Sequence, residues 1–171
     1  GADPRFGIVD TNDDGVDEVV VLRGDPIAAS IDGGGYETTG ERIPLADVKL
    51  LAPVIPRSKV VCIGMNYAEH RAELGHVGND VSARDQMFAD GQWARAKGYD
   101  TFCPIGPWIE TDLDPLGGLE IQTYVDDEPR RHGNTSQMLN DVARIIEYAS
   151  DVWTLLPGDI IVTGTPAGLG G

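Results

Sequence analysis

Residues 59–70 read KVVCIGMNYAEH, and this stretch decides the fold class. Its first half is a short apolar run rich in β-branched residues, which is typical of a buried strand. Its second half begins at Asn66, a good N-cap residue, and Gly75 can end a helix. A buried strand is therefore expected to lead into a short helix over residues 66–75.

The chain before this stretch predicts a small β domain. Residues 6–9 and 18–22 are two apolar runs joined by a turn that contains Asp-Gly, a strong hairpin signal. Residues 25–39 are rich in glycine and are expected to form a loop or linker. The composition becomes more apolar after Pro56, so we expect a small N-terminal domain and linker over 1–56 and a second domain over 57–171.

The hairpin turn also resembles a calcium-binding loop, because Asp10, Asn12, Asp14 and Gly15 have the spacing of the first EF-hand positions. The position of the bidentate carboxylate is occupied by Val21, and no helix is expected on either side. An acidic turn without calcium is therefore the better interpretation.

The second half of the chain adds further strands and one longer helix. Residues 120–125 alternate in polarity as a strand does, and 160–162 form another β-branched run. Between them, apolar residues recur at helical spacing as far as Ala149, and Thr135 or Ser136 can cap that helix. Strands outnumber helices, so the fold class is expected to be α+β and mainly β.

Composition argues against several classes of function. The formal net charge is -15, which opposes binding to nucleic acids and to anionic membrane surfaces. No apolar run approaches the roughly 20 residues that a membrane span requires, and no signal peptide is recognised. Cys62 and Cys103 lack metal-ligand spacing and are expected to be free thiols, so a cytoplasmic protein is predicted.

Several segments carry candidate site residues. His70 and Glu73 are three residues apart on the expected helix, where they form either a water-activating pair or a solvated surface pair. Asp80 offers oxygen ligands to a hard cation, and Arg84 could form an ion pair with Asp85. The alternative for this segment is an Asn-Asp turn followed by the start of a helix. Lys97 lies among aromatic residues, where it is either a partly desolvated cation that stabilises an oxyanion or a surface lysine whose ammonium reaches solvent.

The segment 163–168 reads TGTPAG and follows a buried strand. Its hydroxyl groups and free backbone N–H groups, at Gly164 and Thr165 in particular, suit a carboxylate at the end of a strand. It lacks the Gly-Lys-Ser/Thr of a nucleotide-binding loop, so a nucleotide site is not expected.

Taken in order, five motifs resemble the fumarylacetoacetate hydrolase (FAH) family over about residues 50–171. They are GMNYAEH (64–70), NDVSARD (79–85), QWARAKG (92–98), GPW (106–108) and LPGDIIVTGTP (156–166). The resemblance implies a mixed β-roll catalytic domain preceded by a small N-terminal β domain, a homodimer, and Mg²⁺ or Mn²⁺ as cofactor. The implied substrate is a small 2-oxo dicarboxylic or acylpyruvate-type acid.

The resemblance also implies roles for individual residues. His70 and Glu73 would activate water, Lys97 would stabilise the enolate, and Asp80 would be a metal ligand. Substrate binding would involve Thr165, Gly164 and Arg84. A 2-oxo acid would chelate the metal, which acts as a Lewis acid toward the enolate.

One departure from the family pattern is clear. The family takes two more metal carboxylates from a Glu-x-Glu strand, and no such motif occurs between Glu73 and Asp80. Since Mg²⁺ needs six oxygen ligands, we expect a missing segment near residues 75–76, and further strands after residue 171.

The reaction stays open at this point. Hydrolysis of a β-diketo acid, isomerisation of 2-hydroxyhepta-2,4-diene-1,7-dioate and decarboxylation of oxaloacetate all form an enolate beside a metal. A scaffold or binding protein that has lost its metal site is the non-enzymatic alternative.

Overall fold

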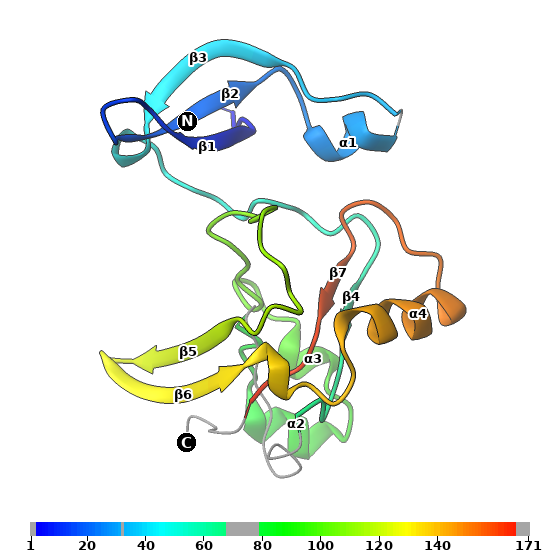
Figure 1. Cartoon of the computed structure of the whole chain (residues 1–171). Coiled ribbons are helices and arrows are strands. Elements are labelled where there is room, and N and C mark those ends of the chain that lie inside the picture. Colours follow the sequence, from blue (N-terminus) through cyan, green and yellow to red (C-terminus); the bar gives the residue numbers. More distant parts are fainter. Residues whose placement is uncertain (1–2, 32, 68–78, 167–171) are drawn as a thin grey trace.

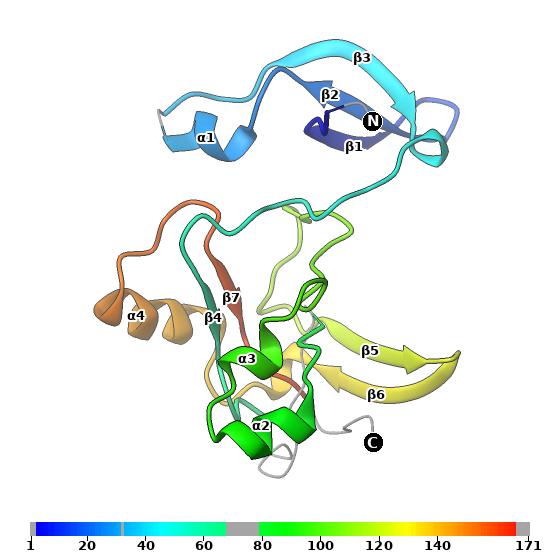
Figure 2. The ribbon, with the colours of Figure 1, turned by 180° about the vertical axis from the view of Figure 1, so that it is seen from behind.

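In the computed structural model of the protein, residues 3–31, 33–67 and 79–166 are described. Figures 1 and 2 show two lobes, with the N-terminal strands and one short helix in the upper lobe and the remaining elements in the lower lobe. None of the helices in the described ranges is both long and apolar enough to cross a membrane.

The upper lobe is a three-stranded antiparallel sheet of β1 (Gly7–Thr11), β2 (Asp17–Leu22) and β3 (Thr38–Pro44), in the order β1-β2-β3. The hairpin predicted from the Asp-Gly turn is confirmed, with Val9 opposite Val19. The Asn12 side-chain oxygen accepts hydrogen bonds from the backbone N–H groups of Asp14 and Val16, at 3.1 and 3.0 Å. The turn is therefore closed by its own side chain.

The prediction of an irregular loop over 25–39 is wrong in part, because α1 spans Pro26–Ile31. The Asp25 carboxylate accepts hydrogen bonds from the N–H groups of Ile27 and Ala28, at 2.9 and 3.4 Å, and proline is favourable at a first helical position. Asp25 also forms an ion pair with Arg57, which links the upper lobe to the chain entering the lower lobe.

At the centre of the lower lobe, β4 (Val60–Cys62) and β7 (Ile160–Val162) pair in parallel, with Val61 opposite Ile161. Both strands were predicted. Their N-terminal ends are tied by Asp159, whose carboxylate accepts from the Ser58 hydroxyl at 2.6 Å and from the Lys59 ammonium at 2.5 Å. The two strands therefore start in register and end side by side.

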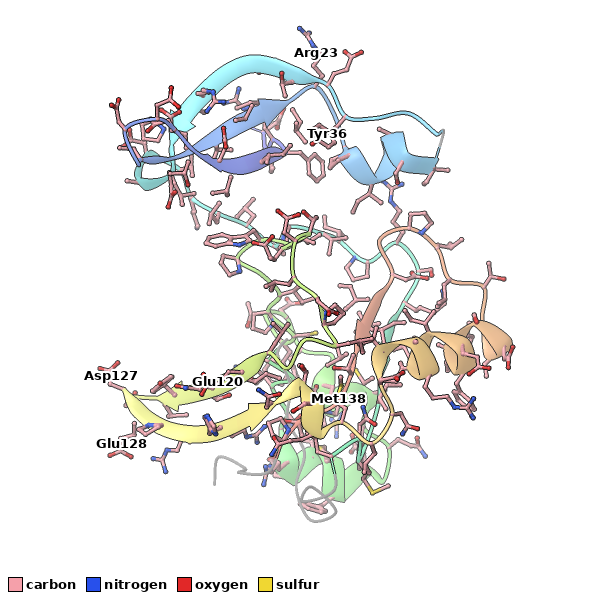
Figure 3. All side chains as sticks on the ribbon, in the orientation of Figure 1. Arg23, Tyr36, Glu120, Asp127, Glu128 and Met138 are labelled. Carbon is pink, nitrogen blue, oxygen red and sulfur yellow. The ribbon has the colours of Figure 1, made fainter. Side chains whose placement is uncertain are left out.

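A long hairpin of β5 (Glu120–Val125) and β6 (Glu128–Asn134) extends from the lower lobe. Its turn residues Asp126 and Asp127 both have positive φ, at 50° and 63°, as a tight type I′ turn requires. Figure 3 shows Asp127 and Glu128 at the tip of the hairpin and Glu120 toward its base.

The helix predicted to start at Thr135 or Ser136 begins later. A capping box closes a single 3₁₀ turn, η3 (Thr135–Gln137), and α4 spans Val142–Val152 with Asp141 as its N-cap. Between the two, the Leu139 N–H donates to the Asn66 carbonyl at 2.7 Å, which holds the chain extended. Local capping signals alone could not reveal this tertiary contact.

The remaining elements are short: η1 (Leu45–Asp47), α2 (Arg84–Asp90) and α3 (Ala94–Lys97). Figure 2 shows α2 and α3 together near β4 in the lower lobe. Most of the expected helix over 66–75 lies outside the described residues, and so do His70 and Glu73.

Candidate anion-binding site at the ends of the parallel strands

The carboxyl ends of β4 and β7 bring two distant parts of the chain together. The Ile63 N–H donates to the Val162 carbonyl at 2.9 Å, so the ladder continues one step past β4. The chain then runs to Tyr67 on one side and through 163–166 on the other. Ligands in folds with parallel strands commonly bind beyond these strand ends.

Asn66 locks these two strand ends together. It is 1% exposed, and its side-chain N–H₂ donates to the Asn140 and Thr163 carbonyls at 2.9 and 2.8 Å. Its side-chain oxygen accepts from the Asn140 N–H at 2.8 Å and from the Asn140 side chain at 3.1 Å. The sequence predicted a helix cap here, but the structure shows that this amide holds three segments in place.

Gly164 fits because it has no side chain. Its φ is +106°, and a Cβ there would lie 2.8 Å from the Asn66 Cβ and 3.2 Å from the Ile63 carbonyl oxygen. Only glycine allows this close approach at such a φ. Its predicted contribution to substrate binding through the backbone stays a prediction.

Thr165, the next residue, is buried, with 2% of its surface exposed. Its hydroxyl oxygen accepts a hydrogen bond from Nη1 of Arg131 at 2.9 Å. Arg131 comes from β6 and was not predicted from the sequence as a site residue. Alternation along the regular part of β6 was the available signal, since Arg131 and Gly133 share one face of the strand.

Lys97 and Asp80 form an ion pair that is mostly shielded from solvent. The ammonium donates to the Asp80 carboxylate and, at 3.0 Å, to the Ser82 hydroxyl. The Lys97 and Asp80 side chains are 24% and 14% exposed. The ammonium also lies 5.9 Å from the centre of the Trp93 ring, within cation–π range. The partial desolvation predicted for Lys97 is therefore observed.

Cys62 connects this ion pair to the end of β4. Burial is the main cause that raises the pKa of its thiol, and the electrostatic influence of the nearby Asp80 and Cys103 raises it further, while Lys97 acts in the opposite direction. These charges act at Cys62 because they lie close to it, although part of the residue is exposed. Both cysteines are free thiols, as predicted.

Tyr67 is a second residue of the site that was not predicted from the sequence. It is 2% exposed, and its hydroxyl has no hydrogen-bond partner among the described residues. Burial raises the pKa of this phenol, so it is protonated at neutral pH. A buried hydroxyl without a partner is costly, and this one is available as a donor to a ligand.

Two other predictions remain outside this cluster. Arg84 begins α2 and is exposed, and its role in substrate binding stays a prediction. Among the described residues, no group of three His, Cys, Asp or Glu side chains is placed to hold a metal ion. The Asp80 carboxylate can supply oxygen ligands, but one carboxylate by itself does not make a complete site for Mg²⁺ or Mn²⁺.

The arrangement defines a class of site: a buried hydroxyl, two cationic side chains and one carboxylate near the ends of parallel strands, in a β-rich domain. Positive N–H and ammonium donors suit an anionic ligand such as a carboxylate. Comparison with known proteins agrees with this class. Residues 76–171 match the model of the fumarylacetoacetate (FAA) hydrolase C-terminal domain, and residues 1–53 match that of the Rv2993c-like N-terminal domain.

Individual relatives support the match. Protein Rv2993c of Mycobacterium tuberculosis is 41% identical over 77% of this chain and 74% of its own length. A crystal structure of 2-hydroxyhepta-2,4-diene-1,7-dioate isomerase from Mycobacterium marinum matches with a TM-score of 0.77 and 36% identity, over 98% of this chain and 89% of that one. Maleylpyruvate hydrolase from Sphingobium sp. SYK-6, in complex with manganese(II) and pyruvate, matches with a TM-score of 0.63 and 25% identity, over 98% and 90%.

The chain therefore belongs to the fumarylacetoacetate hydrolase family, and the predicted family and mainly-β α+β fold are confirmed. The alignment with Rv2993c spans 196 residues while it includes only 77% of this 171-residue chain. That relative thus has internal residues without a counterpart here. The position of a missing segment near residues 75–76 stays a prediction.

Proposed function

We propose that the protein is a divalent-metal-dependent hydrolase that cleaves a C–C bond in small 2-oxo or β-diketo acids of the acylpyruvate or fumarylacetoacetate type. The observation that carries the proposal is the buried Thr165 hydroxyl, held by Arg131 at the strand ends and accompanied by the Lys97–Asp80 pair. Membership of the FAH family supports the reaction class.

In this proposal each described residue has a chemical task. Thr165 donates its hydroxyl hydrogen to the substrate carboxylate. Lys97 places a positive charge near the oxygen on which the negative charge of the enolate develops. Its ammonium is partly desolvated and contacts Trp93 and Ser82. Asp80 contributes an oxygen ligand to Mg²⁺ or Mn²⁺, and the remaining ligands are proposed to come from residues outside the described ranges.

His70 and Glu73 are proposed to activate the attacking water, as the resemblance implies. A histidine with a carboxylate three residues away on a helix suits a general base. Arg84 is proposed to approach the substrate from the start of α2. Hydrolysis, unlike decarboxylation, needs the water, so loss of His70 should impair hydrolysis more than decarboxylation.

Isomerisation is the second candidate, because a similar solved structure is described as 2-hydroxyhepta-2,4-diene-1,7-dioate isomerase. A panel of acylpyruvates, oxaloacetate and this dienedioate, assayed with Mn²⁺ and with Mg²⁺, separates the reactions. Cleavage of an acylpyruvate supports the proposal. Turnover of the dienedioate alone supports the isomerase, and turnover of none supports a scaffold without activity.

We also propose that the protein is a homodimer. Several large apolar residues between β4 and β5 are exposed, namely Trp108, Ile109, Leu113 and Leu116. Exposed apolar groups of this size often mark an interface. Light scattering coupled to size-exclusion chromatography should give twice the mass of the chain. A monomer at micromolar concentration would contradict this.

A further inference from the structure

Arg131 occupies an unusual place for an arginine on a projecting hairpin. Its neighbours Arg130 and His132 are exposed: Arg130 forms an ion pair with Glu128 at 2.9 Å, and the His132 ring lies 2.5 Å from the Glu120 carboxylate. Arg131 is half-buried and reaches the Thr165 hydroxyl. The two adjacent arginines therefore differ in burial and in the groups that they contact.

The contact with Thr165 is enforced by the backbone. Gly133 lies two residues along the same face, and a Cβ at this glycine would lie 2.3 Å from the Cβ of Pro166. This close approach holds β6 against residues 165 and 166. The backbone of β6 at Arg131 is thereby placed within side-chain reach of the Thr165 hydroxyl.

The hydrogen-bond chemistry gives the contact a direction. A threonine hydroxyl has one hydrogen to donate and two lone pairs. Because Arg131 donates to Thr165, the hydroxyl hydrogen must point elsewhere, and its described acceptor, the Pro166 carbonyl, lies 3.4 Å away. The hydroxyl is thus prepared to donate to an incoming acceptor. The guanidinium beside it is planar and matches the two oxygens of a carboxylate.

We infer that Arg131 is a specificity-determining residue that binds the substrate carboxylate together with Thr165. The inference rests on the proposed function, since it names the group of the substrate that this part of the site recognises. It predicts that the site prefers an ionised acid to the neutral ester of the same acid. If Arg131 only stabilised the packing of β6 against residues 165 and 166, it would not make the site prefer the ionised acid to its ester.

The test compares pyruvate with methyl pyruvate, in the presence of Mn²⁺, by isothermal titration calorimetry on the full chain. Replacing Arg131 by Gln should weaken pyruvate binding by about 10- to 100-fold, the usual worth of a hydrogen bond to a charged group. Binding of methyl pyruvate should change by less than about twofold, within the scatter of a neutral contact. Arg131→Lys keeps the positive charge but loses the two parallel N–H donors of the guanidinium. Its affinity for pyruvate should therefore lie between those of the wild type and Arg131→Gln.

Arg130→Gln is the matched control, because it removes the same charge from the adjacent, exposed position of the same strand. It should leave both ligands unaffected. Circular dichroism and the Tm of each variant establish that it is folded, and Arg131→Lys serves in place of Arg131→Gln if the latter does not fold. Equal losses for the acid and the ester would assign Arg131 a bracing role and overturn the inference.

The outcomes separate this inference from the proposed function. If the wild type cleaves an acylpyruvate and Arg131→Gln leaves its KM and the Kd of pyruvate unchanged, the function stands and the inference fails. If the wild type cleaves none of the acids but binds pyruvate in an Arg131-dependent way, the function fails and the subsite stands. A wild type that neither binds pyruvate nor cleaves any acid contradicts both.

Discussion

Lys97 is the residue whose surroundings most resemble those of a catalytic cation. Its ammonium is held by Asp80 and Ser82 and lies over the Trp93 ring, so little rearrangement is needed when negative charge develops nearby. A preorganised donor of this kind stabilises a transition state more than a mobile surface lysine does.

Lys97→Ala should therefore lower kcat by about 10²- to 10³-fold, the usual cost of losing one oxyanion donor. The Tm should fall as well, because removal of the ammonium leaves the largely buried Asp80 carboxylate without its cation, so kcat is compared at a temperature where both proteins are folded. Steady-state kinetics on an acylpyruvate measures the loss. Lys49→Ala, at an exposed lysine, is the control. A near-normal kcat for Lys97→Ala would remove this residue from the site.

Gly133 carries a prediction about stability. Gly133→Ala would place a Cβ 2.3 Å from the Cβ and 2.4 Å from the Cγ of the Pro166 ring, which cannot rotate away. Overpacking of this kind should lower the free energy of unfolding by about 1–3 kcal/mol. Urea denaturation measures the change. Gly24→Ala, with no heavy atom within 4 Å of its added Cβ, should be close to neutral. Equal stabilities would show that β6 is not pressed against this segment.

At the scale of elements, the parallel pair of β4 and β7 depends on an ion pair at its start. The Lys59 ammonium and the Ser58 hydroxyl, together with backbone N–H groups, hold the pKa of the Asp159 carboxyl well below its usual range. A lowered folded-state pKa means that the carboxylate stabilises the fold above the unfolded-state pKa of about 3.9, and that this contribution is lost as the pH falls toward the folded-state value.

Asp159→Asn should consequently destabilise the protein at neutral pH and flatten the loss of stability below about pH 4, where the unfolded-state carboxyl takes up its proton. Urea unfolding at a series of pH values from about 6 to about 2 records both effects. Asp151→Asn, at an exposed carboxylate on α4, should keep the wild-type acid profile. If Asp159→Asn loses stability at low pH as steeply as the wild type does, other carboxylates cause most of the acid destabilisation.

The elements that the sequence predicted correctly are those with strong local signals. The Asp-Gly hairpin and the β-branched runs of β4 and β7 are decided by a few neighbouring residues. The start of α4 was misplaced because a capping box at Asn134 and a contact from Leu139 to Asn66 interrupt the helical pattern. Helix α1 was missed because Asp25 caps it within a stretch that composition marks as a loop.

The same limit applies to the site. Asp80, Lys97 and Thr165 were identifiable from motifs, and the structure places the first two together and buries the third. Arg131 and Tyr67 were not identifiable, because their importance depends on strand register and on burial. These are properties of the folded chain, and a single sequence does not display them.

At the scale of the whole molecule, metal binding should stabilise the folded state. A saturating metal at about 100 times its Kd adds about 2.7 kcal/mol, and for a chain of this size that raises the Tm by about 5 °C or more. Differential scanning fluorimetry with Mn²⁺ measures the shift. Asp80→Asn should abolish it, whereas Asp85→Asn, at an exposed neighbour, should keep it. A full shift in Asp80→Asn would mean that Asp80 is not a ligand.

The central claim is that this member of the FAH family cleaves a C–C bond of a 2-oxo acid with a divalent metal. The most direct measurement is the release of pyruvate from an acylpyruvate by the full-length protein, with Mn²⁺ and again after EDTA treatment. We expect steady release that requires Mn²⁺ and falls by orders of magnitude in Lys97→Ala. Release at the same rate in EDTA, or no release from any acylpyruvate with Mn²⁺ present, would contradict it.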